Sequence, residues 1–292
     1  MRTAEASRQR PLVGLSLMPD AHFLALLRPL LERGAIEAVE WTIDFSFEEE
    51  GPAELLDFCA ESDRLFGHGV GYSPLSARRS QHQERWLAAA KEATRRRRYR
   101  RLSEHFGFLR APPFRSGPPL PMPFTKDVLR IGQDRLKRLA DATGVPVGLE
   151  NLALAFSRED ALRHGEFLDA LLEPVDGFLC LDLHNLYCQQ HNFALGPELL
   201  ASYPLDRVRV LHVSGGSFSQ PSMTEAGQLF RRDTHDSEVP REVFALLPAA
   251  LAAAPNVELI MLERLSESLE SPHDLERDLE ALHAILDEEE AL

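Results

Sequence analysis

Histidine and carboxylate side chains recur at the ends of short apolar segments, and they are the residues of this sequence that could do chemistry. With a polar loop near residue 234, they form one set of candidate ligands: His68, His105, Glu150, Asp182, His212, Asp233, His235 and Glu263. Burying such groups is costly unless a partner neutralises or hydrogen-bonds them. The simplest single explanation is that they converge on metal ions.

Each of these residues also has an ordinary structural explanation. A lone histidine at a strand end more often makes a structural hydrogen bond, and Glu150 with Asn151, or Asp182, could cap a following helix. Several carboxylates in one place would, however, repel one another and raise each other's pKa unless cations were present. Mixed histidine and carboxylate ligation suits iron, manganese or zinc rather than magnesium alone. The set exceeds what one ion takes, so we expect roughly two or three ions, bridged by Glu150 or Asp182.

Short apolar segments alternate with amphipathic segments, which predicts alternating strands and helices. The predicted strands are Leu12–Leu17, Glu37–Thr42, Phe66–Val70, Leu102–His105, Pro146–Asn151, Phe178–Leu183, Val208–Val213 and Val257–Glu263. The predicted helices are Ala21–Arg33, Pro52–Asp63, Gln81–Arg98, Thr125–Thr143, Arg158–Leu172, Pro197–Tyr203 and Arg241–Ala254, with a last one from Ser271. This order predicts the α/β class and a (β/α)8 TIM barrel. An open doubly wound sheet would need a glycine-rich turn after its first strand, and GLSLMPD contains none.

In a (β/α)8 barrel the active site lies at the C-terminal ends of the strands, so the candidate ligands are expected to share one rim. His184 and Asn185 follow Asp182 at the end of the sixth strand and are candidate catalytic residues. For Glu40, near the end of the second strand, a structural role and a hydrogen bond to a ligand weigh equally. The long segments Ala111–Phe124 and Ser214–Glu238 are expected to wall the substrate site.

Composition excludes several classes of function. The net charge of −14 argues against a general nucleic-acid binder. The basic run Arg95–Arg101 fits either an anion-binding patch or a solvated helix end, and the second is favoured. Without a long apolar stretch we expect no membrane span and no signal peptide. Three cysteines without framework spacing suggest a reducing, cytoplasmic setting. We expect one domain over residues 1–292, with a flexible start at 1–11 and a helix with an acidic tail at 271–292.

Seven ordered motifs carry a family resemblance: HGVGYS, SEHFGF, GLENLA, LDLHNLY, LHVSGG, RRDTHD and LER. In this order they resemble the multinuclear non-heme iron-dependent oxidases, the family of the methanobactin-biosynthesis oxidase. The resemblance extends from Leu12 to Glu263. It departs from the family pattern at GLSLMPDAH, which lacks the usual arginine, at Tyr72, and at His184, where the family commonly has asparagine.

The resemblance implies a xylose-isomerase-like TIM barrel that holds two or three iron ions of mixed Fe(II)/Fe(III) state, with O2 as co-substrate. By motif, His68, His105 and Glu150 would bind one iron, and the other five candidate ligands would bind the rest. Family members oxidise a cysteine, or an aspartate or asparagine, in a ribosomally synthesised precursor peptide. Many act with a separate partner protein that recognises the leader, and we expect such a partner here because the chain leaves no room for a recognition domain.

Two other classes of function remain open from the residues alone. A divalent-metal-dependent sugar isomerase or phosphodiester hydrolase could use the same barrel. The isomerase would want a catalytic lysine or a His–Asp base, and the only lysines, Lys91, Lys126 and Lys137, fall in predicted helices. The hydrolase acting on DNA would want a basic mouth. A metal-holding scaffold without activity is the non-enzymatic alternative.

Overall fold

The computed structural model describes residues 10–47, 51–110, 118–221 and 229–290. The predicted flexible start therefore lies almost entirely outside the described residues. Parts of the two predicted substrate walls, residues 111–117 and 222–228, and the last two residues of the acidic tail also lie outside them. Among the described helices, none is long and apolar enough to cross a membrane.

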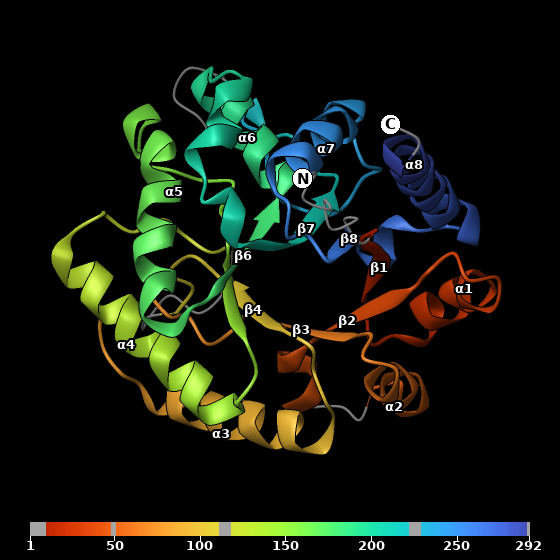
Figure 1. The fold of residues 1–292 in the computed structure, drawn as a ribbon, viewed down its shortest axis with the longest axis horizontal. Helices are drawn as coiled ribbons and strands as arrows, with labels where there is room; N and C mark the ends of the chain where they lie inside the picture. The colour runs from red at the N-terminus through yellow and green to blue at the C-terminus, as the bar shows by residue number, and fades with distance from the viewer. Residues whose placement is uncertain (1–9, 48–50, 111–117, 222–228, 291–292) are drawn as a thin grey trace, which may run out of the picture.

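Eight parallel strands close into a barrel in their order along the chain, which confirms the predicted (β/α)8 fold (Figure 1). The strands are β1 Leu12–Leu17, β2 Ala38–Thr42, β3 Leu65–Gly69, β4 Leu102–His105, β5 Val147–Glu150, β6 Phe178–Asp182, β7 Val208–Ser214 and β8 Leu259–Glu263. Each boundary lies within two residues of its predicted position. Short, nearly continuous apolar segments of this kind are typical of strands buried on both faces.

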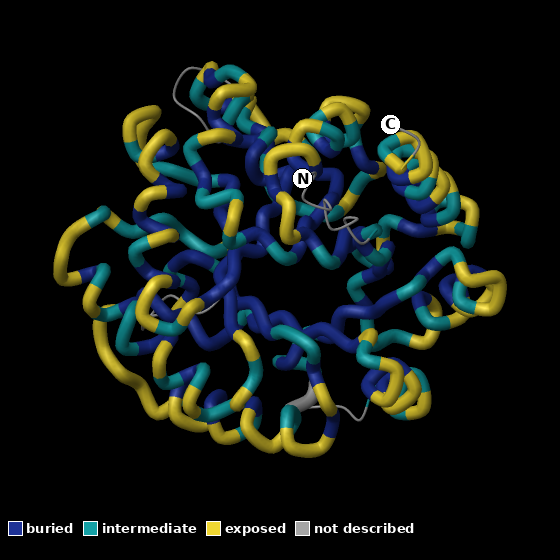
Figure 2. Tube along the Cα trace, viewed as in Figure 1, coloured by how far each residue is buried: buried dark blue, intermediate teal, exposed yellow. Residues whose placement is uncertain are grey.

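The helices surround the barrel, with their outer faces exposed and the strands buried (Figure 2). They are α1 Ala21–Glu32, α2 Ala53–Glu61, α3 Gln81–Arg96, α4 Lys126–Thr143, α5 Arg158–Leu172, α6 Leu183–Phe193, α7 Arg241–Ala253 and α8 Pro272–Glu290. Several begin at a polar cap: Ser80, for example, forms a capping box with Gln83 at the start of α3.

The sixth helix is the one element whose prediction was wrong. The expected helix Pro197–Tyr203 is a short 3-10 helix, Pro197–Ser202, whereas α6 begins directly after β6. The cause is Asp182, which ends the strand and accepts a hydrogen bond from the backbone N–H of Asn185, so that it caps a helix with no intervening loop.

The interior of the barrel is apolar in its N-terminal half. Side chains of one cluster fill it: Ala38, Phe66, Phe178, Cys180, Val210, Leu259 and Met261. Alternate residues of a strand face the same side. The residues two positions after Ala38, Phe66 and Val210 are therefore also inward-facing, and they are Glu40, His68 and His212. A separate, larger apolar cluster lies between the strands and the helices.

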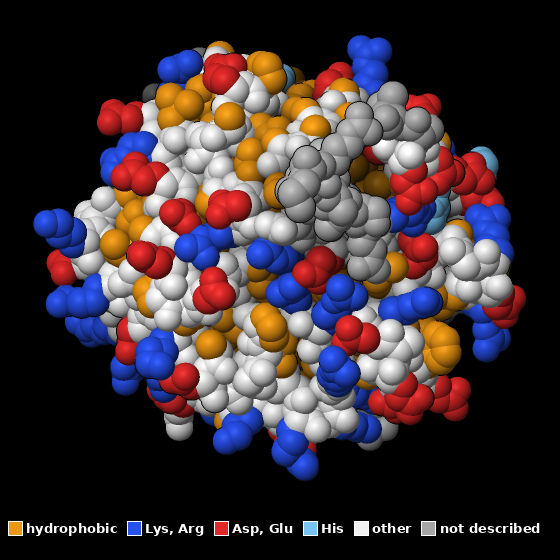
Figure 3. Space-filling model, in the orientation of Figure 1, with side chains coloured by type: hydrophobic (Ala, Val, Ile, Leu, Met, Phe, Trp, Pro, Cys, Tyr) orange, Lys and Arg blue, Asp and Glu red, His pale blue; other side chains and the backbone are white. Residues whose placement is uncertain are grey.

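The basic run Arg95–Arg101 ends α3 and leads into β4. Its first two residues are exposed in the last turn of α3, as a solvated helix end would be. Farther on, Arg97 pairs with Asp57 at 2.6 Å and Arg100 with Glu258 at 2.9 Å. Much of the run thus contacts the protein's own carboxylates, and the face seen in Figure 3 carries interspersed basic and acidic side chains.

A buried ion pair anchors the end of β8 to α8. Arg264, which directly follows Glu263, contacts Asp278 at 3.0 Å, and their side chains are 4% and 2% exposed. The same Asp278 oxygen accepts a hydrogen bond from the backbone N–H of Val239 at 3.3 Å. The pair fixes the backbone that carries Glu263.

We expect Asp278→Ala to lower the free energy of unfolding by about 3–5 kcal/mol, because it leaves Arg264 buried without a counter-charge. In the double variant Arg264→Met/Asp278→Leu most of this loss should be regained, since neither charge remains. Urea unfolding followed by circular dichroism measures both. A loss below about 1 kcal/mol in the single variant would show that the pair does not hold this strand end.

Candidate metal centre

Glu150, the last residue of β5, lies among three imidazoles. Its Oε2 is 3.4 Å from Nε2 of His68, 3.7 Å from Nε2 of His105 and 3.8 Å from Nδ1 of His212. Its Oε1 accepts a hydrogen bond from the side-chain amide of Asn185 at 3.3 Å. Oε2 itself has no hydrogen bond to any described residue. A buried carboxylate oxygen surrounded by nitrogen donors is the arrangement that a shared cation would stabilise.

Ser103 orients His68. The Ser103 hydroxyl lies 2.8 Å from Nδ1 of His68 and 3.5 Å from the carbonyl oxygen of Gly67. A hydroxyl that donates to the carbonyl accepts from the Nδ1–H group, so this hydrogen-bond network assigns the tautomer with a free lone pair on Nε2. That lone pair is directed toward Glu150.

His212, near the end of β7, lies between two carboxylates. Its Nδ1 is 3.2 Å from Oε2 of Glu263, the last residue of β8, and its Nε2 is 3.3 Å from Oε2 of Glu40 on β2. Glu40 is only 1% exposed. A carboxylate close to one imidazole nitrogen, while the other nitrogen faces a cluster of ligands, is a common arrangement around a metal-binding histidine.

Asp182 combines a helix cap with an unused oxygen. Its Oδ1 accepts from the N–H of Asn185 at 2.5 Å, and its own N–H donates to Oδ1 of Asn151 at 2.7 Å. The side-chain amide of Asn151 donates in turn to the Asp182 carbonyl at 3.1 Å. Oδ2 of Asp182 has no hydrogen bond to a described residue. Capping and metal binding are compatible here because each uses a different oxygen.

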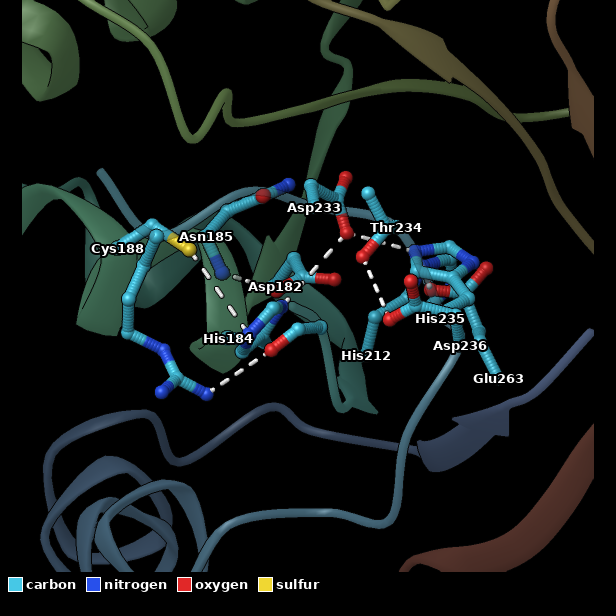
Figure 4. A network of polar contacts seen from close by, with 12 residues as sticks. Asp182, His184, Asn185, Cys188, His212, Asp233, Thr234, His235, Asp236 and Glu263 are labelled. Carbon is cyan, nitrogen blue, oxygen red and sulfur yellow. Dashed lines mark hydrogen bonds and ion pairs between the residues drawn. The ribbon is translucent and has the colours of Figure 1, made fainter. Parts of the chain in front are cut away.

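The sequence had indicated that His184 and Asn185 follow Asp182 at the end of the sixth strand. In the structure both lie in the first turn of α6. Asn185 contacts Glu150, and His184 is fully buried, with Nδ1 3.7 Å from Oδ1 of Asp233 and Nε2 3.8 Å from Sγ of Cys188 (Figure 4). Both therefore touch the cluster, and their catalytic roles stay predictions.

The loop after β7 brings Asp233 and His235 back over the rim. Oδ1 of Asp233 is 2.7 Å from Nε2 of His235, which lies 3.7 Å from Oε2 of Glu263 (Figure 4). His235 has a φ of 52°, in the left-handed region, and its carbonyl accepts from the N–H of Leu265 at 3.0 Å. Such a conformation persists only where the surroundings fix it. The side chains of Asp233 and His235, 17% and 25% exposed, form the more open side of the cluster.

The C-terminal part of α6 holds this loop in place. Asn192 exchanges two hydrogen bonds with the backbone of Arg231: its amide donates to the carbonyl at 3.0 Å, and its oxygen accepts the N–H at 2.8 Å. The Arg231 guanidinium lies over the rings of Tyr187 and Phe218, at 4.9 and 4.8 Å from their centroids. Since Arg231 is two residues before Asp233, α6 positions the loop ligand as well as the cap at Asp182.

Burial shifts the pKa of the most deeply placed groups toward their neutral forms. It raises the pKa of Glu150 and of Asp182 well above the ordinary values, with neighbouring carboxylates adding to the shift. It lowers the pKa of His68 well below its usual value, and that of His105 as well. A cation would reverse the penalty on the two carboxylates, because it favours their charged form.

Opposite charges outweigh burial in the other half of the cluster. Burial alone would depress the pKa of His212, but contact with the Cys180 sulfur and the carboxylates of Glu263 and Glu40 hold it well above the ordinary value. Burial likewise opposes ionisation of Glu263, yet His212 and His235 lower its pKa. Burial would also lower the pKa of His235 and raise that of Asp233. Instead the pKa of His235 is raised and that of Asp233 is lowered, because each stabilises the other's charge. This half holds ion pairs, whereas burial dominates the pKa values of Glu150, Asp182, His68 and His105.

The donor atoms fall into groups that could each hold an ion. Atoms within 4.8 Å of one another come from His68, His105 and Glu150; from Glu150, Asp182, His212 and Glu263; from Asp182, Asp233 and His235; and from Glu150, Cys180 and His212. All the candidate ligands from the sequence occur in these groups, and Glu150 and Asp182 are shared between groups. Cys180 belongs to the apolar cluster and burial raises the pKa of its thiol, so it is a poor ligand there.

Sequence reasoning missed the residues that orient the cluster. Ser103 is an inward-facing residue two positions before His105, and strand alternation could have suggested it. Nothing in the sequence pointed to Asn192 and Arg231. Their contact joins segments far apart in the chain, and it requires α6, which was not predicted. For Glu40 the sequence favoured neither a structural role nor contact with a ligand. Its position 3.3 Å from Nε2 of His212 favours contact with a candidate ligand.

Comparison with known proteins identifies relatives over most of the chain. Residues 14–287 match the model of a family described as the RiPP precursor modification enzymes MbnB/TglH/ChrH. A UPF0276 protein of Streptomyces avermitilis is 29% identical over 245 residues, which are 81% of this chain and 48% of that protein. A UPF0276 protein of Caulobacter vibrioides is 30% identical over 242 residues, 81% of each chain. The chain thus spans about half the length of the first relative.

Solved structures share the fold. Endonuclease IV from Thermus thermophilus superposes with a TM-score of 0.58 at 15% identity, covering 95% of this chain and 100% of that one. A xylose isomerase-like TIM barrel protein from Mycobacterium smegmatis, solved with magnesium, gives 0.57 at 14% identity, covering 94% and 96%. At these identities the likeness establishes a xylose-isomerase-like TIM barrel and nothing about activity.

We expect Glu40→Ala to weaken metal binding about 10–100-fold, because His212 loses the carboxylate beside its Nε2. Titration of metal-free protein with a competing chelator measures the affinity. Glu37→Ala, at the N-terminal end of β2 and paired with Arg10, is the matched control and should bind metal normally. Equal affinities in the two variants would remove Glu40 from the centre.

We expect Asn192→Leu to release the loop that carries Asp233 and His235 and so to weaken the most loosely held ion about 10–100-fold. Plasma mass spectrometry of the metal retained after dialysis, with secondary structure checked by circular dichroism, measures this. Asn256→Leu removes another amide that bonds a backbone carbonyl, at an exposed site before β8, and should retain full metal. If Asn192→Leu also retains full metal, the clamp has no role in the centre.

Proposed function

Since the chain belongs to the MbnB/TglH/ChrH family of RiPP precursor modification enzymes, we propose that it is an O2-dependent, multinuclear iron oxidase. Its substrate is a cysteine, or an aspartate or asparagine, of a ribosomally synthesised precursor peptide. A separate leader-recognition protein is the partner that this function would employ. The observation that carries the proposal is the crowding of Glu150 Oε2 by three histidine nitrogens at 3.4–3.8 Å, without a hydrogen bond to a described residue.

The donor set fits iron. Histidine nitrogens and carboxylate oxygens occur together in every group, and this mixture suits iron better than magnesium. His68, His105 and Glu150 would hold one ion. Glu150, Asp182, His212 and Glu263 would hold a second, and Asp182, Asp233 and His235 a third. When bound, iron supplies one-electron redox chemistry and activation of O2.

The residues around the donors keep these ligands in one geometry. Ser103 sets the ring of His68, Glu40 lies 3.3 Å from Nε2 of His212, and Asn185 contacts both shared carboxylates. The floor of the site is the apolar interior of the barrel, which excludes water from beneath. The open side lies at Asp233 and His235, so the substrate residue would enter there. His184, behind Asp233, would position that carboxylate.

The rival enzyme classes lack comparable support. The three lysines lie on α3 and α4 and none belongs to the donor groups, so a sugar isomerase would depend on the Asp233–His235 pair at 2.7 Å, which the proposed function uses as metal ligands. The net charge of −14 disfavours a hydrolase acting on DNA. The fold shared with endonuclease IV does not decide the matter, because one barrel hosts many chemistries.

We expect the iron-loaded protein to change the mass of its precursor peptide in air and to leave it unchanged without O2. The peptide to use is the product of a short reading frame beside the gene, and mass spectrometry gives the readout. His105→Ala should lose more than about 100-fold in rate, since even residues that only orient ligands cost about 10–100-fold. His273→Ala, an exposed histidine on α8, should keep full activity.

Equal modification with and without O2, or by His105→Ala and the unaltered protein, would refute an iron-dependent oxidation at this rim. Modification without O2 but with magnesium would favour the rival classes.

A further inference from the structure

A pocket of about 560 Å³ lies between the segments that follow β3 and β4, the strands that carry His68 and His105. Its wall has an apolar part, with Tyr72, Phe108 and Met122, and a basic part, with Arg78, Arg110 and His82. No part of this pocket is among the groups that could hold a metal.

The pocket is within reach of a short peptide held at the cluster. Tyr72 follows His68 by four residues, and Phe108 follows His105 by three. Because an extended residue spans about 3.3–3.6 Å, the backbones of Tyr72 and Phe108 lie no more than about 14 Å from that of a candidate ligand. About four residues of an extended peptide cover that distance.

Two guanidinium groups of the pocket are unneutralised. Arg78 and Arg110 are exposed, and neither has an ion pair with a described residue. Neighbouring arginines differ: Arg79 contacts Asp134 at 2.9 Å, and Arg138 contacts Glu84 at 2.7 Å. The described lining includes no aspartate or glutamate. In a chain with a net charge of −14, a basic pocket without its own counter-ion indicates an anionic ligand.

Hydrogen bonds hold the two walls in one frame. The Ser73 hydroxyl accepts from the N–H groups of Leu109 and Arg110 at 2.8 and 3.2 Å, and it lies 2.8 Å from the hydroxyl of Ser76. Ser76 donates to the Arg110 carbonyl at 2.8 Å. The amide of Gln83 donates to the carbonyls of Tyr72 and Ser73. The backbones that carry Arg78 and Arg110 are therefore fixed relative to each other before a ligand binds, which lowers the entropic cost of binding.

We propose that this pocket binds a carboxylate of the peptide substrate, within about four residues of the residue oxidised at the metal centre. The inference rests on the proposed function in taking the substrate to be a peptide. Carboxylates are the ordinary anions of an unmodified ribosomal peptide, and the planar guanidinium group matches them in shape and charge. Tyr72, Phe108 and Met122 accommodate an apolar neighbour of that residue.

The carboxylate can belong to an acidic side chain or to the C-terminus, and three probes separate these sources. They are acetyl-Cys-Gly-Gly-Asp amide, acetyl-Cys-Gly-Gly-Gly free acid and acetyl-Cys-Gly-Gly-Gly amide, titrated calorimetrically at low salt. We expect one or both acidic peptides to bind about tenfold or more tightly than the uncharged one. Tighter binding of the aspartate peptide identifies an acidic side chain as the source, and tighter binding of the free acid identifies the C-terminus.

Arg78→Ala and Arg110→Ala should each reduce this preference, and the double variant should abolish it. Arg79→Ala, which removes a guanidinium already paired with Asp134, should leave it unchanged. Three probes of equal affinity, no binding of either acidic probe, or a preference that survives the double variant would overturn the proposal.

The same titrations with chelator-treated protein separate this proposal from the proposed function. The carboxylate preference should persist without metal, because the pocket contains none of the proposed ligands. A protein that shows this preference but holds no iron would contradict the oxidase function alone. An iron-loaded, active protein without the preference would contradict the pocket alone.

Discussion

The burial of ionisable groups without partners at one end of the barrel is the constraint on which the rest of the structure depends. Glu150 shows it most clearly, since burial raises its pKa while three imidazoles surround an oxygen that has no hydrogen bond to a described residue. Leaving such groups unpaired costs several kcal/mol each, roughly. A site that keeps such groups in place of hydrophobic side chains is explained most simply if cations complete it. The chain belongs to a family described as RiPP precursor modification enzymes.

The architecture supplies this site through two devices. Strand alternation puts an apolar layer at the bottom of the barrel and donor groups in the layer above it, so that Phe66 gives way to His68 and Val210 to His212. The second device is helix α6. Asp182 caps its start, the side chain of Asn185 donates to Glu150, and the side chain of Asn192 holds the loop that bears Asp233. Ligands far apart in sequence are thereby tied to one rigid element.

The fold and the meeting of the candidate ligands at one rim could be predicted because both depend on local pattern. Short apolar segments ending in histidine or carboxylate define the strands and, in a barrel, one rim. What could not be predicted depends on distances between segments. The start of α6 was missed because Asp182 is both the end of a strand and a helix cap, which periodicity alone does not distinguish. The contacts of Ser103 with His68 and of Asn192 with Arg231 require the closed barrel, and so does the meeting of Arg78 and Arg110 in one pocket.

Metal analysis combined with Mössbauer spectroscopy on protein purified without O2 tests the central claim most directly. The account predicts roughly two or three irons per chain, in magnetically coupled sites of both oxidation states once air is admitted. A protein that takes up one magnesium or zinc ion per chain, and no iron when iron is offered, would contradict it.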